Sequence, residues 1–525
     1  MKLLKWVFIL LIGISAHLFA EHWIADLGNG RYRNPILFAD YSDPDVVRVG
    51  DDFYMVASSF NCMPGLPVLH SKDLVNWTIT GHVYDKLPFE KFDKPAHGHG
   101  CWAPAIRFHE GRFYVYFCTP HTGLFMASAD DPAGTWELHQ VASVEMWEDP
   151  CPFWDDDGNA YLVRSKLRGD ILYLHRMSPD GRTLMDNGKI IFRDEKNQPT
   201  IEGPKFLKKD GYYYILAPAG GVPRGWQTVL RSRNIDGPYE TRVVLHQGNT
   251  EINGPHQGGL VALESGEWWF LHFQDRGPYG RIVHLQPVLW QDDWPLTGED
   301  VNGDGIGEPV LEWQKPDVGR EHPVCIPQMS DEFDSGLLGL QWQWHANPKA
   351  AWYSLTENPD CLRLYSVQNL TQDGNFWFVP NLLLQKFPAP SFSTSTRMTA
   401  SLDLAGERSG LVVMGETWAY LAMTKTEDGI QLGMYNGQFE RALDATQLIE
   451  SVPVEDASCT MRAEIHDQAV CTFSYSLNEE DFVPIGKPFK ARKGRWIGAK
   501  VGIFHINPNI KESQGFTDFD WFQID

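Results

Sequence analysis

The first two-thirds of the chain repeats one pattern of apolar and polar positions. In each repeat a proline precedes a short extended segment, then an acidic or glycine turn, and then an aromatic strand, as in residues 200–217. Short alternating segments without a 3.6-residue period predict β-hairpins rather than helices. The prolines that open the repeats stand at positions 44, 104, 150, 204 and 255, in steps of 60, 46, 54 and 51 residues.

The repeat length predicts a β-propeller with five blades. Units of roughly 50 residues with four strands each are typical of propeller blades, which bury their cores by packing in a ring. Proline has no N–H for a central ladder and therefore belongs at the start of a strand. We expect each proline to mark the innermost strand of a blade. The residues just before the prolines should then meet at one mouth of the central channel.

The pattern changes after a proline-rich segment, residues 309–329. From about residue 330 the chain shows short alternating strands, such as residues 395–404 and 515–524. These predict a jelly-roll-like, concanavalin-like β-sandwich. The predicted fold is therefore all-β: a five-bladed β-propeller followed by a β-sandwich. We expect a signal peptide over 1–20, the propeller domain over 21–315, a linker over 316–330 and the sandwich domain over 331–525.

The N-terminus predicts export. Residues 1–20 contain lysines, an apolar run and the small residue Ala20 before Glu21. This is typical of a secretory signal peptide rather than of a membrane span, and we expect cleavage near Ala20. No other segment is apolar and long enough to cross a bilayer, so the mature protein should be periplasmic or secreted.

Charge narrows the class of partner. The 525 residues carry a formal net charge of −23. Nucleic-acid binding needs a basic footprint, and docking on anionic lipid needs the same, so we expect neither partner. A neutral substrate fits this charge, whereas an anionic substrate would need a local basic pocket. The eight cysteines show no metal-type spacing, and their pairing is left open, as is the oligomeric state.

Three carboxylates stand at equivalent points of three repeats: Asp43, Asp149 and Glu202. Glu202 precedes a Gly-Pro corner at an apolar strand end, where partial burial and a nearby carboxylate would raise its pKa, as a general acid requires. Asp43 is then the natural base for a water molecule, and Asp149 could tune or orient Glu202. Two carboxylates on either side of a neutral substrate are typical of glycoside hydrolysis.

The ordered motifs resemble those of glycoside hydrolase family 43, the β-xylosidases and α-L-arabinofuranosidases. The motifs that carry the resemblance are Asp43-Pro44, Trp102-Ala103-Pro104, Asp149-Pro150, Glu202-Gly203-Pro204 and Gly280-Arg281. The resemblance extends over the C-terminal sandwich. It implies hydrolysis with inversion, in which Asp43 is the general base, Glu202 the general acid, and Asp149 the group that modulates the pKa of the acid and orients it.

The resemblance also implies a set of binding residues. Phe60 and Trp102 match aromatic walls of the sugar pocket, with Ala103 beside them, and Arg281 matches an arginine that contacts sugar hydroxyls. His256 matches a histidine that lies in the central channel near a calcium ion or a water molecule. No cofactor is implied for the chemistry, and the implied calcium is structural.

In the branch that the sequence resembles, the sandwich leans over the active site and enforces release of single sugars from the non-reducing end. We therefore expect an exo-acting enzyme that releases xylose from xylo-oligosaccharides or hemicellulose side chains of the plant cell wall. The segment 502–507 is our candidate for the closing loop. His97 and His99 are expected to be solvated loop residues.

Other functions stay open at this point. An α-L-arabinofuranosidase would use the same mechanism, because both pentoses offer similar hydroxyls. An endo-arabinanase would need an open cleft. A fructanase-type propeller would need Asn-Asp-Pro-Asn-Gly and Arg-Asp-Pro motifs, where this chain has Tyr-Ser-Asp-Pro and Glu-Asp-Pro. A carbohydrate-binding propeller without activity would tolerate the loss of a carboxylate, yet all three are present.

Overall fold

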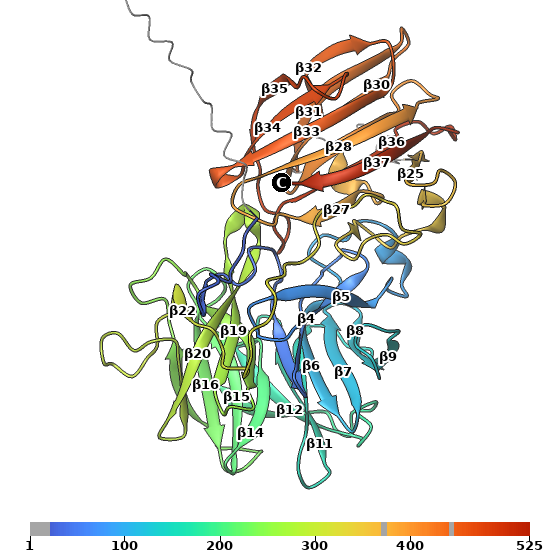
Figure 1. Ribbon diagram of the computed structural model, residues 1–525. Coiled ribbons are helices and arrows are strands. Elements are labelled where there is room, and N and C mark those ends of the chain that lie inside the picture. The colour runs from blue at the N-terminus through green and yellow to red at the C-terminus, as the bar shows by residue number, and fades with distance from the viewer. Residues whose placement is uncertain (1–21, 369–374, 440–445) are drawn as a thin grey trace, which may run out of the picture.

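The computed structural model describes residues 22–368, 375–439 and 446–525 (Figure 1). The predicted signal peptide lies outside these residues. Across the described chain the secondary structure is β-strand, with short 3-10 turns at Glu90–Asp93, Gly277–Tyr279, Ala350–Trp352, Phe376–Phe378 and Asp467–Ala469. None of the helices in this part of the chain could cross a membrane.

Five four-stranded antiparallel sheets form the N-terminal domain, each from one continuous stretch of chain. Their strands are β2 (Asp45–Val49), β3 (Asp52–Val56), β4 (Gly65–Ser71) and β5 (Trp77–Tyr84); β6 (Trp102–His109), β7 (Arg112–Thr119), β8 (Gly123–Ala129) and β9 (Glu137–Ala142); β10 (Trp147–Trp154), β11 (Ala160–Lys166), β12 (Ile171–Met177) and β13 (Lys189–Arg193); β14 (Lys205–Lys209), β15 (Tyr212–Ala219), β16 (Trp226–Ser232) and β17 (Glu240–Leu245); β18 (His256–Ala262), β19 (Trp268–Asp275), β20 (Arg281–Gln291) and β21 (Trp294–Thr297). The predicted five-bladed propeller is confirmed.

The ring is closed by the segment before the first blade. β1 (Arg31–Arg33) pairs antiparallel with β22 (Glu312–Gln314), which follows the last blade. The buried Asn34 side chain donates hydrogen bonds to the carbonyl oxygens of Leu285 and Val310, both at 2.8 Å. Residues 31–34 therefore hold the two ends of the propeller together.

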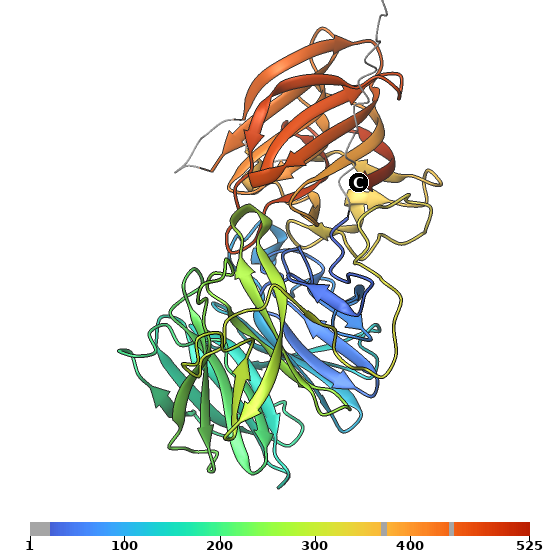
Figure 2. The same cartoon turned by 60° about the vertical axis from the view of Figure 1, so that its left-hand side comes forward.

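The C-terminal domain is a sandwich of two sheets, as predicted. One sheet contains, in order, β23 (Gln343–Trp344), β27 (Leu383–Lys386), β36 (Lys500–Asn507), β29 (Arg408–Met414), β30 (Thr417–Lys425), β31 (Ile430–Gln438) and β32 (Gln447–Val454), with β26 (Val367–Gln368) beside β36. The other contains β24 (Tyr353–Ser354), β25 (Leu362–Tyr365), β37 (Phe516–Ile524), β28 (Phe392–Ser401), β33 (Ser458–His466), β34 (Val470–Ser476) and β35 (Val483–Lys490). Figures 1 and 2 show the sandwich stacked over one end of the propeller.

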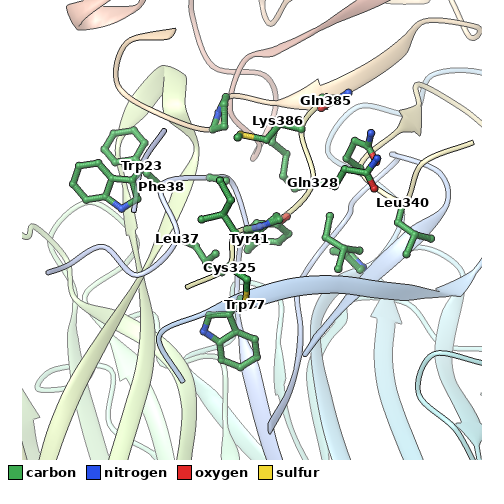
Figure 3. A pocket seen from close by; sticks show the side chains of 18 of the residues that line it. Trp23, Leu37, Phe38, Tyr41, Trp77, Cys325, Gln328, Leu340, Gln385 and Lys386 are labelled. Carbon is green, nitrogen blue, oxygen red and sulfur yellow. The ribbon is translucent and has the colours of Figure 1, made fainter. Parts of the chain in front are cut away.

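A mostly apolar cavity lies where the two domains meet (Figure 3). Its walls come from the segment before the first blade, from the linker and from the sandwich, and include Trp23, Tyr41, Cys325 and Lys386. Burial and the neighbouring Lys500 lower the pKa of the Lys386 amine to about 7. The two domains therefore contact each other along a largely apolar boundary.

Candidate active site

Each blade enters its innermost strand through the same unusual backbone turn. The residue before the proline has a left-handed conformation in all five blades, with φ of 54° at Asp43, 32° at Ala103, 53° at Asp149, 56° at Gly203 and 52° at Gly254. Residues other than glycine rarely adopt this region, and such strain gathers at functional sites. The turn repeats because it places one residue from every blade at the same mouth.

Asp43 is buried and fully engaged by neighbouring donors. Its carboxylate accepts hydrogen bonds from Ser42 Oγ at 2.7 Å, Ser58 Oγ at 2.6 Å and the Arg281 guanidinium at 2.9 Å. The side chain is 5% exposed. Charge-assisted hydrogen bonds of this kind are short and directional, so the Asp43 carboxylate is held in a fixed position.

Asp149 and Glu202 meet across the boundary between the third and fourth blades. The Asp149 carboxylate accepts a hydrogen bond from the Gly203 N–H at 2.7 Å, next to Glu202. Burial, with Asp149 nearby, raises the pKa of Glu202 to about 8. Burial and Asp43 raise the pKa of Asp149 to about 6, although the Gly203 N–H opposes the shift. At neutral pH Glu202 is therefore mainly protonated.

A fourth carboxyl group, Glu148, was missed by the sequence reasoning. It is 5% exposed, and a cluster of carboxylate oxygens from Glu148, Asp149 and Glu202 lies within 4.8 Å. Burial, then Asp149 and Glu202, raise its pKa to about 10. The signal was present: Glu148 precedes the left-handed residue of its blade as Glu202 precedes Gly203. Glu148 stands two residues before Pro150, as Glu202 stands two residues before Pro204, so the proline alignment itself places the two glutamates at the same position.

The aromatic and backbone groups expected at the pocket lie beside Asp43. Phe60 is 3% exposed and its ring centroid lies 6.3 Å from that of the half-buried Trp102. Ala103 acts through its backbone, because its N–H donates to Ser58 Oγ at 2.7 Å. Since Ser58 in turn donates to Asp43, the second blade helps to hold the carboxylate of the first.

Arg281 lies in the pocket and not on a surface turn. It is 8% exposed, and its guanidinium contacts Asp43 and Ser42. Its backbone N–H donates to Asp40 Oδ1 at 2.8 Å, while Asp40 Oδ2 accepts from the N–H of Gly498 in the sandwich at 3.0 Å. Asp40 therefore connects the position of Arg281 to the second domain.

His256 lies fully buried, with its Nε2 atom 3.8 Å from a carboxylate oxygen of Glu202. Burial and the nearby Arg281 lower its pKa to about 4. Neither ring nitrogen has a hydrogen-bond partner among the described residues. A buried polar atom of this kind fits a bound water molecule. Calcium prefers oxygen ligands, so the imidazole fits a water of a calcium ion better than the ion itself.

The closing loop differs from the one expected. Residues 502–507 lie inside β36, a buried central strand of the sandwich paired with β27 and β29, and do not form a loop. The segment 491–499, just before β36, reaches the mouth instead. Trp496 lies there with its ring 6.3 Å from Trp102 and 5.8 Å from the Arg281 guanidinium. The expectation failed because a strand pattern does not reveal which adjoining loop faces a second domain.

Gly498 makes this approach possible. A Cβ atom there would lie 2.7 Å from the backbone nitrogen of Gly280 and 2.8 Å from the carbonyl carbon of Tyr279. Only a residue without a side chain lets the two backbones come so close. The next residue, Ala499, donates its N–H to the carbonyl oxygen of Pro278. The loop is thus bonded directly to the turn that precedes Arg281.

The expectation of solvated loop histidines holds for His99, which is exposed, but not for His97. His97 stacks on Trp377 of the sandwich with centroids 3.5 Å apart, and its Nε2 atom lies 2.7 Å from the Trp377 carbonyl oxygen. It therefore fastens a propeller loop to the second domain. His99 lines the cleft, 5.3 Å from the His121 ring. The expectation was wrong for His97 because its partner lies 280 residues away.

A cleft of about 620 Å³ opens at this mouth and includes Trp102, Glu148, Glu202 and Trp496 in its lining. This volume is in the range of pockets that hold small ligands. One carboxylate is paired with an arginine and another carboxyl group stays protonated at neutral pH. The separated protonation states, on a five-bladed propeller, define a glycoside hydrolase.

Comparison with known proteins specifies the family. Residues 32–295 match the model of glycosyl hydrolases family 43, and residues 330–525 match the β-xylosidase C-terminal concanavalin A-like domain. The chain belongs to glycosyl hydrolases family 43.

Several relatives match over nearly the full length. A provisionally named β-xylosidase of Xylanibacter ruminicola is 42% identical over 479 residues, covering 91% of this chain and 86% of that protein. A non-reducing end α-L-arabinofuranosidase of Bacteroides ovatus is 30% identical over 541 residues, covering 96% of both chains. The crystal structure of a xylan β-1,4-xylosidase from Bacillus halodurans has a TM-score of 0.81 at 27% identity, covering 94% of this chain and 99% of that one.

Proposed function

We propose that the protein is an exo-acting, inverting β-xylosidase that releases xylose from the non-reducing end of xylo-oligosaccharides. The observation that carries this proposal is the presence of two unlike carboxyl groups at the same mouth of the propeller. Asp43 is held by Arg281 and two hydroxyls, whereas burial keeps Glu202 protonated at neutral pH. The names of the β-xylosidase relatives support the choice of sugar.

In the proposed reaction a water molecule attacks the anomeric carbon on the side of Asp43, which accepts the proton. On the opposite side Glu202 gives its proton to the glycosidic oxygen as the bond to the leaving sugar breaks. The configuration at the anomeric carbon is thereby inverted. After the reaction Asp43 is protonated and Glu202 is ionised. A proton that passes from Asp43 through solvent to Glu202 returns the enzyme to its starting state.

Asp149 has a positioning role in this proposal. Its negative charge favours the protonated form of Glu202, and its hydrogen bond from the Gly203 N–H fixes the backbone next to the acid. Phe60, Trp102 and Arg281 form the walls around the sugar, with the Ala103 backbone behind them. Each of these assignments is a proposal from position and contacts.

The sandwich loop supports exo action. Trp496 and its neighbours stand over Trp102 and Arg281, so a long polymer chain cannot pass freely through the mouth on that side. An enzyme closed on one side removes the terminal sugar. This arrangement favours exo action over the endo-arabinanase and over an open lectin-like surface.

An α-L-arabinofuranosidase is the second candidate. The observation in its favour is the similarity to the arabinofuranosidase of Bacteroides ovatus over 96% of both chains. The catalytic steps would be the same, and only the fit of the sugar ring would differ.

Two further proposals concern the setting of the enzyme. The apolar N-terminal segment supports export, with cleavage near Ala20. The unpartnered nitrogens of His256 support a water-bound, structural calcium in the channel, where the ion would supply fixed positive charge near the carboxyl groups. Neither the proposed water attack nor the proton transfers depend on it.

The test is hydrolysis of aryl β-D-xyloside and aryl α-L-arabinofuranoside in parallel, with Glu202→Gln as the control. We expect the xyloside to react faster, with xylose released first as its α-anomer in proton NMR. A faster arabinofuranoside would establish the second candidate. Release of β-xylose would contradict inversion, and internal cleavage of a xylo-oligosaccharide would contradict exo action.

A further inference from the structure

One wall of the active-site cleft is positively charged, although the chain as a whole carries a net charge of −23. Lys166, Arg168 and Arg495 line this wall together with His99 and His121. We call the first three the basic wall. Lys166 is the last residue of β11, Arg168 lies in the loop that follows, and Arg495 comes from the sandwich, so two domains contribute to the wall.

The loop that carries Arg168 is rigidly built. Arg168 and Asp170 both have left-handed backbone conformations, with φ of 61° and 44°. The Gly169 N–H donates to the Lys166 carbonyl oxygen at 2.8 Å, and the Leu167 N–H donates to the Met146 carbonyl oxygen at 3.0 Å. The Asp170 carboxylate accepts from the Thr200 N–H. Backbone strain held in place by such contacts is a feature of functional loops.

The cationic side chains of the wall are available to a ligand. Both Lys166 and Arg168 are exposed, and both line the cleft. Arg495 lies over the Trp496 ring at 4.9 Å rather than against an acid. A basic surface without counter-charges attracts anions from solution.

The acidic residues of the cleft do not cancel this charge. The pKa of Glu148 is raised to about 10 and that of Glu202 to about 8, in both cases first by burial, so both are mainly neutral at pH 7. Asp170 is the remaining acid in the lining. The pKa of His99 is lowered by burial and then by the positive charges of His121, Lys91 and Arg495, which is further evidence of a positive field.

The basic wall lies on the side of the leaving sugar. It shares the cleft with Glu202, the proposed proton donor to the leaving oxygen, whereas Asp43 does not line this cleft. Sugars beyond the scissile bond would therefore lie along Lys166, Arg168 and Arg495.

We propose that the basic wall binds a carboxylate on the leaving part of the substrate, a uronic acid carried by the hemicellulose chain. The inference rests on the proposed function, since it assigns the leaving-group side from the role of Glu202. Arginine and lysine side chains on a fixed loop recognise carboxylates through charge-assisted hydrogen bonds. The enzyme would thus favour xylose linked to an acidic oligosaccharide over xylose linked to a neutral one.

The experiment compares kcat/KM for xylobiose with that for the same disaccharide carrying glucuronic acid on its reducing-end xylose. We expect the acidic substrate to be favoured about tenfold at low salt, the combined effect of two or three exposed ion pairs. The preference should shrink with added salt, because exposed charges are screened. In a Lys166→Gln/Arg168→Gln variant the ratio should fall toward one, and Arg168→Glu should invert it.

Arg176→Gln is the matched control, because Arg176 is exposed on β12 of the same blade and outside the cleft lining. It removes one positive charge and should leave the ratio unchanged. A ratio of one in the unaltered protein, or an unchanged ratio in the double variant, would overturn the proposal.

If neither substrate releases xylose, the proposed function is wrong. The carboxylate-binding role of the basic wall is then tested separately by measuring binding. Calorimetric titration of the Glu202→Gln protein with the two saccharides should then still show tighter binding of the acidic one, and weaker binding in the double variant. Equal affinities would refute the wall as a carboxylate site.

Discussion

The propeller partly buries one glutamate, Glu202, and the sandwich fully buries another, Glu407, but the two environments shift the carboxyl pKa in opposite directions. At the propeller mouth burial raises the pKa of Glu202 to about 8. Inside the sandwich Glu407 is fully buried, and yet its pKa is lowered to about 2. Burial alone therefore does not decide the charge of a carboxyl group.

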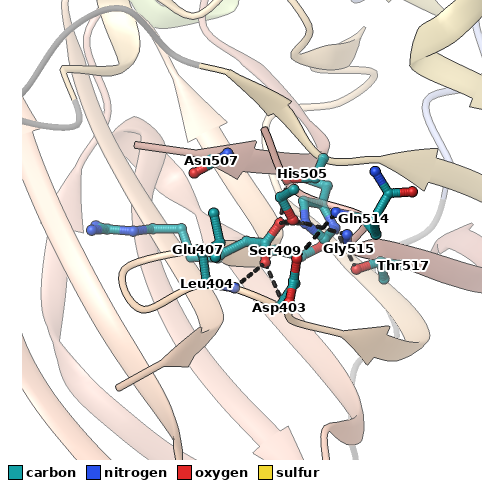
Figure 4. Close-up of polar contacts among 12 residues, drawn as sticks. Asp403, Leu404, Glu407, Ser409, His505, Asn507, Gln514, Gly515 and Thr517 are labelled. Atoms are coloured by element: carbon teal, nitrogen blue, oxygen red, sulfur yellow. Dashed lines mark hydrogen bonds and ion pairs between the residues drawn. The ribbon is translucent and has the colours of Figure 1, made fainter. Parts of the chain in front are cut away.

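The difference lies in the hydrogen-bond donors (Figure 4). Glu407 accepts from Ser513 Oγ at 2.6 Å, from Ser366 Oγ, from the backbone N–H groups of residues 403 and 404, and lies 3.2 Å from His505 Nε2. These contacts, led by His505, outweigh the effect of burial on its pKa. The second ring nitrogen of His505 lies 2.9 Å from Thr517 Oγ1. Glu407 thus ties together the loops at one end of the sandwich.

Glu202 has the opposite surroundings. Its carboxyl neighbours are Glu148 and Asp149, and its backbone N–H donates a hydrogen bond to the Pro218 carbonyl oxygen. A buried carboxyl group with many donors stabilises a fold, whereas one with few donors and acidic neighbours is kept protonated at a cost in stability. The second arrangement is what a proton donor needs.

The largest expected effect is on catalysis. Glu202→Gln removes the proton donor and should lower kcat on xylobiose by about 10²–10⁴-fold, the usual contribution of a general acid. An aryl xyloside with an acidic phenol as leaving group needs less protonation and should lose much less. Steady-state kinetics on both substrates provides the measurement. Equal losses on the two would contradict the assignment of Glu202 as the acid.

The corresponding change in the sandwich should affect stability instead. Glu407→Ala leaves His505 and two serines without their buried partner and should lower the free energy of unfolding by about 3–5 kcal/mol. Scanning calorimetry should show this as an earlier transition. Folded Glu407→Ala protein should keep its activity on aryl xyloside, because the cluster lies away from the cleft. Loss of activity in the folded state would show that the sandwich cluster supports the loop at residues 491–499.

The two glutamates should make the stability of the protein depend on pH in opposite directions, and Glu202 should also control the activity. Glu202 must be protonated, so kcat/KM should fall as pH rises through about 8. Because its folded pKa lies above the unfolded value of about 4.3, stability should also fall between about pH 4 and 8. Glu407 has a lowered pKa, so its contribution is present above about pH 4 and is lost as pH falls toward 2.

Single substitutions separate the contributions of Glu202 and Glu407 to the pH dependence of stability. Glu202→Gln should stabilise the protein at pH 7 by about 1–3 kcal/mol, since each pKa unit corresponds to about 1.4 kcal/mol. Glu407→Gln should remove the loss of stability at low pH. Urea unfolding at pH 3, 5 and 7 provides the measurement. A destabilised Glu202→Gln protein at pH 7 would mean that Glu202 is ionised in the fold.

The smallest effect is expected at Glu148. As a neutral group that lines the cleft, it can donate a hydrogen bond to the sugar, which a glutamine would preserve. Glu148→Gln should therefore change kcat/KM by less than about threefold, and Glu148→Leu should lower it by up to about tenfold, the effect of one hydrogen bond.

The alkaline limb of the pH profile tests the charge of Glu148. Since Glu148 titrates above Glu202, it should not influence the limb, which should stay in place in both variants. A limb shifted to lower pH in Glu148→Gln alone would show that Glu148 is ionised and sets the pKa of Glu202.

Much of the fold could be predicted because it follows from local pattern. The spacing of five prolines indicated five blades, and alternating residues after position 330 indicated a sandwich. Both are confirmed. Repetition made the position of Asp43, Asp149 and Glu202 at one mouth predictable, because each stands one or two residues before the proline that opens a blade. Glu148 was missed although it stands two residues before Pro150, as Glu202 stands two residues before Pro204, because its neighbour Asp149 is the carboxyl group next to the proline.

Contacts between distant segments were not predictable. Trp496 and Arg495 reach the cleft from a loop about 200 residues beyond the last blade, and His97 packs on Trp377 of the other domain. The sequence around these residues does not reveal the contacts, because docking depends on the shapes of two folded domains.

The sequence by itself determined the blades, the sandwich and the carboxylates at the mouth, because hairpin periodicity and turn residues act over short distances. Only the tertiary structure decided which loop closes the mouth, where the basic wall stands, and which carboxyl groups are charged. Those properties depend on the donors and charges that folding brings within a few ångströms, as the contrast between Glu202 and Glu407 demonstrates.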